Sequence, residues 1–190
     1  MSIFSLVENY MKRISKAEWL QAALRLFEEE GVEAIRVERL ARELGISKSG
    51  FYWHFKDRDD LRTQMVDYWV HEFNEVVTAN PTLREGVPRK RLESTMLMIL
   101  EHDLTRYEVP MRAWADADPV IARRVQQVYR KRLDFLREIF RDIGFAGDEL
   151  EMRARLLLCH GTWERAMFPK ESKKSLRKLI KRRVDLLSGK

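Results

Sequence analysis

The segment from Val37 to Phe55 contains two short helix patterns separated by only three residues, Gly45-Ile46-Ser47. The first pattern repeats apolar residues at the spacing of one helix face, Val37, Leu40, Ala41 and Leu44. Glycine adopts left-handed backbone conformations at little cost, so Gly45 is placed where a tight turn is easiest. A turn this short holds its flanking helices at a steep angle. The segment is therefore predicted to be a helix-turn-helix.

The remainder of the chain also shows helical periodicity. It has 8 glycines and 5 prolines in 190 residues, and 35% of its residues are charged with both signs interspersed, which favours helices over strands. We expect an all-α fold of about nine helices. They are predicted over about residues 17–30, 37–44, 48–55, 57–80, 92–104, 110–115, 119–143, 149–168 and 172–187.

The periodicity lapses between Asn80 and Pro88, where prolines and a glycine cluster. We place a boundary there and expect an N-terminal domain over residues 1–57, a connecting helix over 57–80 and a helical body over 81–190. Residues typical of helix N-termini support two of these helices: Ser15 with Glu18 forms a capping box, and Asp118-Pro119 is a cap followed by proline in the first turn.

Composition limits the compartment and the chemistry. Cys159 is the single cysteine and cannot form an internal disulfide, and no stretch approaches the roughly 20 apolar residues of a membrane span. No signal sequence is recognised, so a cytoplasmic protein without a membrane partner is expected. Cys159 and His160 point about 100° apart on a helix. We expect no metal site, no cofactor and, for lack of a catalytic constellation, no enzyme activity.

The positive charge is concentrated near the C-terminus. Residues 1–60 carry 10 basic and 11 acidic residues, whereas residues 165–190 carry 10 basic and 2 acidic residues. The net charge of +6 is therefore not itself an argument that the helix-turn-helix binds nucleic acid. The basic C-terminal helix is either a solvated face or an auxiliary contact with nucleic acid, and the sequence leaves both open.

In a helix-turn-helix the second helix enters the DNA major groove, and residues near its N-terminus reach the base edges. Here those residues are Lys48, Ser49 and Gly50. Ser47 and the first backbone N–H groups of the helix suit a phosphate, because unpaired donors and the positive helix dipole point the same way. Tyr52 and His54 extend this surface.

The spacing alone also occurs in ordinary helical bundles, but a longer string is more specific. It comprises Trp19-Leu20, Ala23, Leu26-Phe27 and Gly31, then Val37, Leu40-Ala41, and the run Leu44-Gly45-Ile46-Ser47-Lys48-Ser49-Gly50-Phe51-Tyr52-Trp53-His54-Phe55-Lys56-Asp57-Arg58-Asp59-Asp60-Leu61. This string resembles the TetR family of transcriptional regulators.

The resemblance implies a three-helix DNA-binding domain, a long connecting helix, a divergent helical body with a ligand pocket, and dimerisation through the last two long helices. Lys48 and Ser49 would read bases, while Tyr52, His54 and Arg58 would bind phosphates or brace the helix. One departure concerns the second helix, where the family commonly has Ser or Thr and this chain has Ile35-Arg36. The cap is weakened, and Arg36 either reaches a phosphate or faces solvent.

Aromatic, histidine and methionine side chains of the body could line an apolar cavity or form its core. The pocket hypothesis names Met96, His102, Tyr107, Trp114 and Trp163. The family resemblance, rather than the side chains themselves, favours a cavity.

Residues 149–168 are apolar on more than one side, and residues 172–187 have one apolar face, so these two helices are expected to form a homodimer. A two-fold dimer predicts a palindromic operator in double-stranded DNA, with recognition helices roughly 34–36 Å apart. An unknown small-molecule effector would release the DNA, as in a repressor. The effector, the operator with its target genes, and the choice between repressor and activator stay open.

Two other functions remain open. One is a nucleoid-type protein that binds DNA without sequence preference through the basic C-terminal helix. The other is a helical carrier of small molecules whose helix-turn-helix no longer binds DNA.

Overall fold

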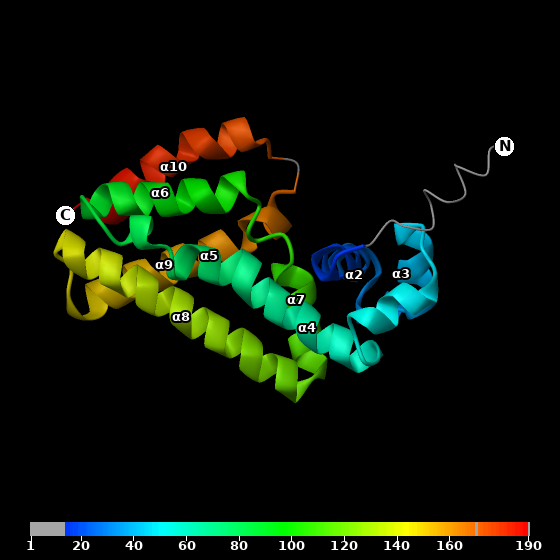
Figure 1. The fold of residues 1–190 in the computed structure, drawn as a ribbon. Helices are drawn as coiled ribbons and strands as arrows, with labels where there is room; N and C mark the ends of the chain where they lie inside the picture. The colour runs from blue at the N-terminus through cyan, green and yellow to red at the C-terminus, as the bar shows by residue number, and fades with distance from the viewer. Residues whose placement is uncertain (1–13, 170, 190) are drawn as a thin grey trace. The chain divides into compact units, whose positions relative to one another are not determined.

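The computed structural model describes residues 14–169 and 171–189. Within these ranges the protein is all-α, with nine α-helices, four short 3₁₀ or π segments and no strand, which confirms the predicted fold class. The chain divides between Trp69 and Val70 into two compact units. We call them unit 1 (to Trp69) and unit 2 (from Val70) and describe each by itself (Figure 1).

Unit 1 consists of short helices around one core. Its elements are α2 (Lys16–Glu30), η1 (Val32–Ala34), α3 (Val37–Leu44), η2 (Lys48–Trp53) and α4 (Arg58–Val70), whose last residue belongs to unit 2. Large side chains from α2, α3, η2 and α4, and that of Ile35 just after η1, are fully buried, namely Trp19, Leu24, Phe27, Ile35, Leu40, Phe51, Leu61 and Met65. Their burial contributes most of the favourable free energy that holds such short helices together.

Side chains at the helix starts match the predicted capping signals. The Oγ of Ser15 accepts from the Glu18 N–H at 3.3 Å, and the Glu18 carboxylate accepts from the Ser15 N–H at 2.8 Å, which confirms the capping box. Asp118 caps α8 by accepting from the N–H of Val120 at 2.8 Å. Each contact satisfies backbone donors that a helix start leaves unpaired.

Unit 2 is a bundle of longer helices. After the π segment η3 (His71–Glu75), α5 (Val76–Thr78) and η4 (Pro81–Leu83), it contains α6 (Pro88–Glu101), α7 (Glu108–Ala117), α8 (Pro119–Ile143), α9 (Gly147–Met167) and α10 (Lys173–Ser188). α10 lies along α6, and α8 packs against both α7 and α9 (Figure 1).

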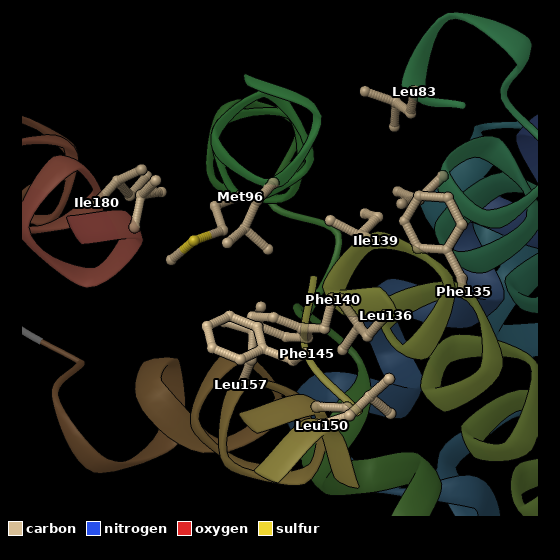
Figure 2. Packing of buried hydrophobic residues seen from close by; sticks show 14 of the residues in the cluster. Leu83, Met96, Phe135, Leu136, Ile139, Phe140, Phe145, Leu150, Leu157 and Ile180 are labelled. Atoms are coloured by element: carbon tan, nitrogen blue, oxygen red, sulfur yellow. The ribbon is translucent and has the colours of Figure 1, made fainter. Parts of the chain in front are cut away.

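The core of unit 2 lies between α6, α8, α9 and α10. Figure 2 shows Met96 extending from α6 toward the side of α10 that carries Ile180, with Leu157 of α9 nearby. Phe140 of α8 and Phe145, which follows α8, have ring centroids 6.3 Å apart in the same cluster. The four helices therefore share one apolar interior, and the cavity described below opens beside it.

Two predicted helices differ from the structure in type. Residues 48–53 form the 3₁₀ helix η2, because a six-residue segment with a glycine and three consecutive aromatic residues has little tendency to extend as an α-helix. The predicted continuous helix over 57–80 is interrupted by the π segment at His71–Glu75, which apolar periodicity does not reveal.

Candidate functional site

The turn between α3 and η2 has the geometry that the glycine predicted. Gly45 adopts φ 68° and ψ 32°, in the left-handed region. The N–H of Ile46 donates to the carbonyl of Ala41 at 3.0 Å, and the N–H of Gly45 donates to that of Arg42 at 3.2 Å. This pair of hydrogen bonds is a Schellman motif, which ends α3 sharply and sets the direction in which η2 leaves.

Phe51 anchors η2 to the core of unit 1. Its ring is fully buried and meets that of Trp19 edge-on, with centroids 5.5 Å apart, and that of Phe55 at 5.1 Å. A Cβ added to Gly50 would lie 3.3 Å from the Cδ1 of Ile46, so η2 approaches its neighbour closely there. Phe51 and Phe55 are both buried and thus belong to the core of unit 1.

The opposite side of η2 is exposed and polar. Ser47, Lys48 and Ser49 are exposed, and the side chain of Tyr52 is 64% exposed. Ser47 makes no capping hydrogen bond; its hydroxyl lies 2.7 Å from that of Ser49. The first N–H groups of η2 are therefore left without a cap from Ser47. The structure brings these four predicted DNA-contact residues onto one short surface, and their roles stay predictions.

Lys48 is paired with α3. Its Nζ lies 2.8 Å from the Oε1 of Glu38, and both side chains are more than half exposed. The hydrogen bond from Lys48 is the main reason that the pKa of Glu38 lies below its ordinary value. Glu38 is thus a carboxylate at neutral pH beside the lysine that is predicted to read bases.

His54 and Arg58 brace the unit. The Nε2 of His54 donates to the carbonyl oxygen of Ile14 at 2.9 Å, because a carbonyl can only accept. Arg58 donates to the carbonyl oxygens of Ile35 at 2.6 Å and Glu33 at 3.2 Å and pairs with the Glu33 carboxylate at 3.1 Å. These contacts correspond to the bracing alternative of the sequence prediction.

Two further residues concern the same surface. Arg36 occupies the position before α3, makes no side-chain cap and is exposed, so the weakened cap is confirmed. Trp53, which the sequence prediction did not select, is 85% exposed directly after Tyr52. The signal for it was the run Phe51-Tyr52-Trp53, because a short helix with one buried face cannot bury three consecutive rings.

Unit 2 contains a cavity of about 270 Å³ between η3, α6, α8, α9 and α10. Of the five predicted pocket residues, Met96 lines this cavity and the other four do not. His102 is exposed at the end of α6, and Trp163 is 39% exposed on α9. Tyr107 is buried against Phe73 with ring centroids 4.9 Å apart, and Trp114 is half-buried on α7.

Residues 14–169 and 171–189 contain no group of three or more His, Cys, Asp and Glu side chains placed to hold a metal ion. Every helix in this part of the chain is too short or too polar to cross a bilayer.

Comparison with known proteins agrees with this description. Residues 20–65 match the family model for bacterial regulatory proteins of the tetR family. The transcriptional regulator AcrR of Shigella flexneri is 29% identical over 86 residues, 45% of this chain and 40% of that protein. A regulator of the helix-turn-helix type from Staphylococcus aureus (strain USA300) is 40% identical over 60 residues, 30% of this chain and 32% of that protein. The matches thus span less than half of these relatives.

Solved structures share the fold over nearly the whole chain. A transcriptional regulator from Rhodococcus sp. Rha1 has a TM-score of 0.70 at 19% identity, covering 93% of this chain and 95% of its own. The regulator FadR from Bacillus subtilis, solved in complex with stearoyl-CoA, has a TM-score of 0.69 at 14% identity, covering 92% and 98%.

Fold and site together define an all-α protein with a helix-turn-helix unit and a separate helical body. The match over residues 20–65 and the regulators named above support the TetR family of bacterial regulatory proteins for this chain. The family and the relatives named above are regulators rather than enzymes, which agrees with the prediction of no enzyme activity.

Proposed function

We propose that the protein is a ligand-responsive repressor that binds a palindromic operator as a homodimer and leaves it when a small molecule binds. One observation carries the DNA-binding part: η2 exposes Ser47, Lys48, Ser49 and Tyr52 while Phe51 fixes it to the core. A rigid short helix that follows a three-residue turn can present such side chains to the major groove in one orientation.

An apolar stripe on α9 supports the homodimer. Met152, Leu156, Trp163 and Met167 repeat at helical spacing and are 39–69% exposed, while Leu150, Ala154 and Leu157 of the same helix are buried. On α10, Leu179 and Leu186 are 40% and 76% exposed. Adjacent exposed apolar side chains mark association surfaces, and two copies of such a surface pair about a two-fold axis.

The cavity of unit 2 supports the effector. Its lining is mostly apolar with a few polar groups, as in small-molecule sites. FadR from Bacillus subtilis, a neighbour in fold, was solved with stearoyl-CoA, so this fold accommodates a small molecule. An effector releases DNA only if it binds more tightly to a conformation with lower DNA affinity. A ligand with equal affinity for both conformations would leave their populations unchanged.

The first test compares binding of the protein to the DNA upstream of its own coding sequence and to shuffled DNA of equal length, across a salt series. We expect selective binding that Tyr52→Ala weakens by about tenfold or more, since a hydrogen bond to a charged group contributes roughly 1.5–3 kcal/mol. Tyr52→Phe keeps the ring and removes only the hydroxyl, so it should weaken binding about as much as Tyr52→Ala if the hydroxyl is the group that contacts the phosphate.

Two outcomes would contradict the proposal. Equal binding to both DNAs, unchanged by Tyr52→Ala and lost on removal of residues 173–190, would favour a nucleoid-type protein that uses the basic α10. Absence of DNA binding, with retained binding of a small molecule, would favour a carrier.

A further inference from the structure

The arginines that line the cavity of unit 2 all have carboxylate partners. Arg183 of α10 donates through Nη1 to Oε2 of Glu164 at 2.8 Å and makes a second bond to the same carboxylate; these side chains are 18% and 15% exposed. Arg165 pairs with Asp103 at 2.5 Å. Arg132 pairs with a fully buried carboxylate, that of Glu108. The cavity therefore presents guanidinium groups whose charge is already compensated.

The remaining ionisable groups of the lining add no net charge. Lys173 and Glu171 have opposite signs and are both exposed at the cavity rim. Burial, and then the nearby Arg183, lower the pKa of His160 below its ordinary value, so its imidazole is mainly neutral at neutral pH. A charged ligand would lose its hydration without meeting an unpaired buried charge of opposite sign.

Threonine hydroxyls supply part of the hydrogen-bonding capacity of the lining, beside the side chains of Asn74, Thr105 and His160. Thr78, Thr95 and Thr162 line the cavity, and each donates its hydrogen to the carbonyl oxygen four residues earlier, at 3.3, 2.8 and 2.7 Å. A hydroxyl has one hydrogen and two lone pairs, so these groups can still accept but have no hydrogen to donate. They fit a ligand that brings an O–H or N–H donor.

The rest of the lining and its size limit the ligand further. Met96, Phe135, Leu136, Leu157 and Ile180 line the cavity and belong to the apolar cluster drawn in Figure 2. A cavity of about 270 Å³ is large enough for a small organic ligand rather than for a single water.

We infer that the effector is a small, uncharged, mainly apolar molecule that carries a hydroxyl or another hydrogen-bond donor. The inference rests on the proposed function, which makes this cavity the effector site. An ionised carboxylate carries a charge and meets guanidinium groups that are already paired with carboxylates. An alkylammonium ion donates but meets carboxylates that are already paired with arginines.

The experiment measures binding of three probes to the full chain by calorimetry at pH 7: 1-octanol, octanoate and octylammonium. We expect 1-octanol to bind at least about tenfold more tightly than either ion. Binding of octanoate or octylammonium as tight as that of 1-octanol would overturn the inference, and so would failure of 1-octanol to bind.

A variant tests whether the ion pairs set this preference. Glu164→Gln keeps the size of the side chain but leaves Arg183 without its carboxylate, so octanoate should bind at least about tenfold more tightly to the variant than to the wild type. Glu171→Gln is the matched control, because it removes one exposed carboxylate that has no hydrogen bond or ion pair to the side chains of residues 14–169 and 172–189. It should leave the order of the probes unchanged.

Circular dichroism establishes that both variants are folded. Unchanged octanoate binding by folded Glu164→Gln would overturn the role of the arginine–carboxylate ion pairs. The inference about the effector is tested on the wild type alone, by comparing its affinities for the three probes. Operator binding is measured separately on the wild type. Its absence would contradict the proposed function, while the order of the probes would still decide the chemistry of the cavity.

Discussion

The Nζ of Lys48 lies 2.8 Å from the Oε1 of Glu38, so the first residue of η2 is paired with the preceding helix. Lys48 must leave this carboxylate to reach a base or a phosphate. Glu38 also places a negative charge beside the surface that is proposed to meet the DNA backbone. The pair therefore opposes DNA binding, by an amount that one substitution can measure.

We expect Glu38→Gln to tighten DNA binding by about two- to fivefold at low salt, because exposed ion pairs contribute roughly 0.2–1 kcal/mol. The gain should shrink as salt rises, since salt screens exposed charges. Gel-shift titrations at several salt concentrations measure it. Glu43→Gln is the matched control, because Glu43 lies on the same helix and pairs with Arg39. An equal gain in both variants would mean that net charge, rather than release of Lys48, is responsible.

Arg58 leads to a prediction about stability. It holds the backbone of Glu33 and Ile35, and a shorter side chain would leave those carbonyls without this donor. We expect Arg58→Ala to lower the free energy of unfolding by about 2 kcal/mol, which corresponds to roughly 4–8 °C in the thermal midpoint of a chain of this size.

The control for Arg58 is Arg36→Ala, the same substitution at an exposed position of unit 1. It should leave the thermal midpoint within about 1–2 °C and weaken DNA binding instead, since surface changes usually cost less than 0.5 kcal/mol. Equal thermal midpoints for the two variants would contradict the bracing role of Arg58.

Structural features were predicted from the sequence where the interacting groups lie within a few residues of one another. The Gly45 turn and the Ser15 cap lie within a few residues of the groups that they satisfy, and both were predicted. The contact of Arg58 with Ile35 spans 23 residues, so the sequence left bracing and phosphate binding as alternatives. The 3₁₀ character of η2 escaped because residue types in so short a segment do not distinguish a 3₁₀ helix from an α-helix.

The cavity was harder to predict for the same reason. Its lining depends on which faces α6, α9 and α10 turn toward one another, and residue type does not determine this. Trp163 and His102 have the side chains of a binding pocket but are exposed. Arg183 and Glu164 look like residues of a solvated face, yet they pair at the cavity wall. Charged residues at helical spacing gave no signal of this pairing.

The carboxylate of Glu151 gives a prediction for acid stability. It links α9 to α8 by accepting from Nε and Nη2 of Arg137, both at 2.7 Å, and it also accepts from Arg155 at 2.5 Å. These hydrogen bonds, first those from Arg137, lower its pKa from 4.5 to about 2. A lowered pKa in the folded state stabilises the protein above pH 4.5, and that stabilisation is lost as the pH falls toward 2.

We expect Glu151→Gln to lower the thermal midpoint at pH 7 and to make it less dependent on pH between 4.5 and 2. Thermal unfolding of the wild type and the variant across this range measures the difference. Glu85→Gln serves as a control, since Glu85 is exposed and its side chain has no hydrogen bond or ion pair with the part of the chain that the structure describes. If the curves of the wild type and Glu151→Gln ran parallel, the carboxylate would not be the group responsible.

The apolar stripe of α9 gives the last prediction. Leu156 is 55% exposed near the middle of the stripe, and a two-fold axis would place two copies of any substituted residue in one interface. Leu156→Glu should therefore weaken the dimer by about a hundredfold or more, since each of two buried charges costs at least about 1.4 kcal/mol, a factor of ten. Sedimentation equilibrium at micromolar protein measures the change. Val120→Glu is the matched control, because Val120 is 58% exposed at the start of α8, outside the stripe. Loss of the dimer in Leu156→Glu alone, together with loss of operator binding, would support association through α9. A Leu156→Glu protein that stays dimeric would place the interface elsewhere, because an apolar contact surface does not tolerate two unpaired carboxylates near its centre.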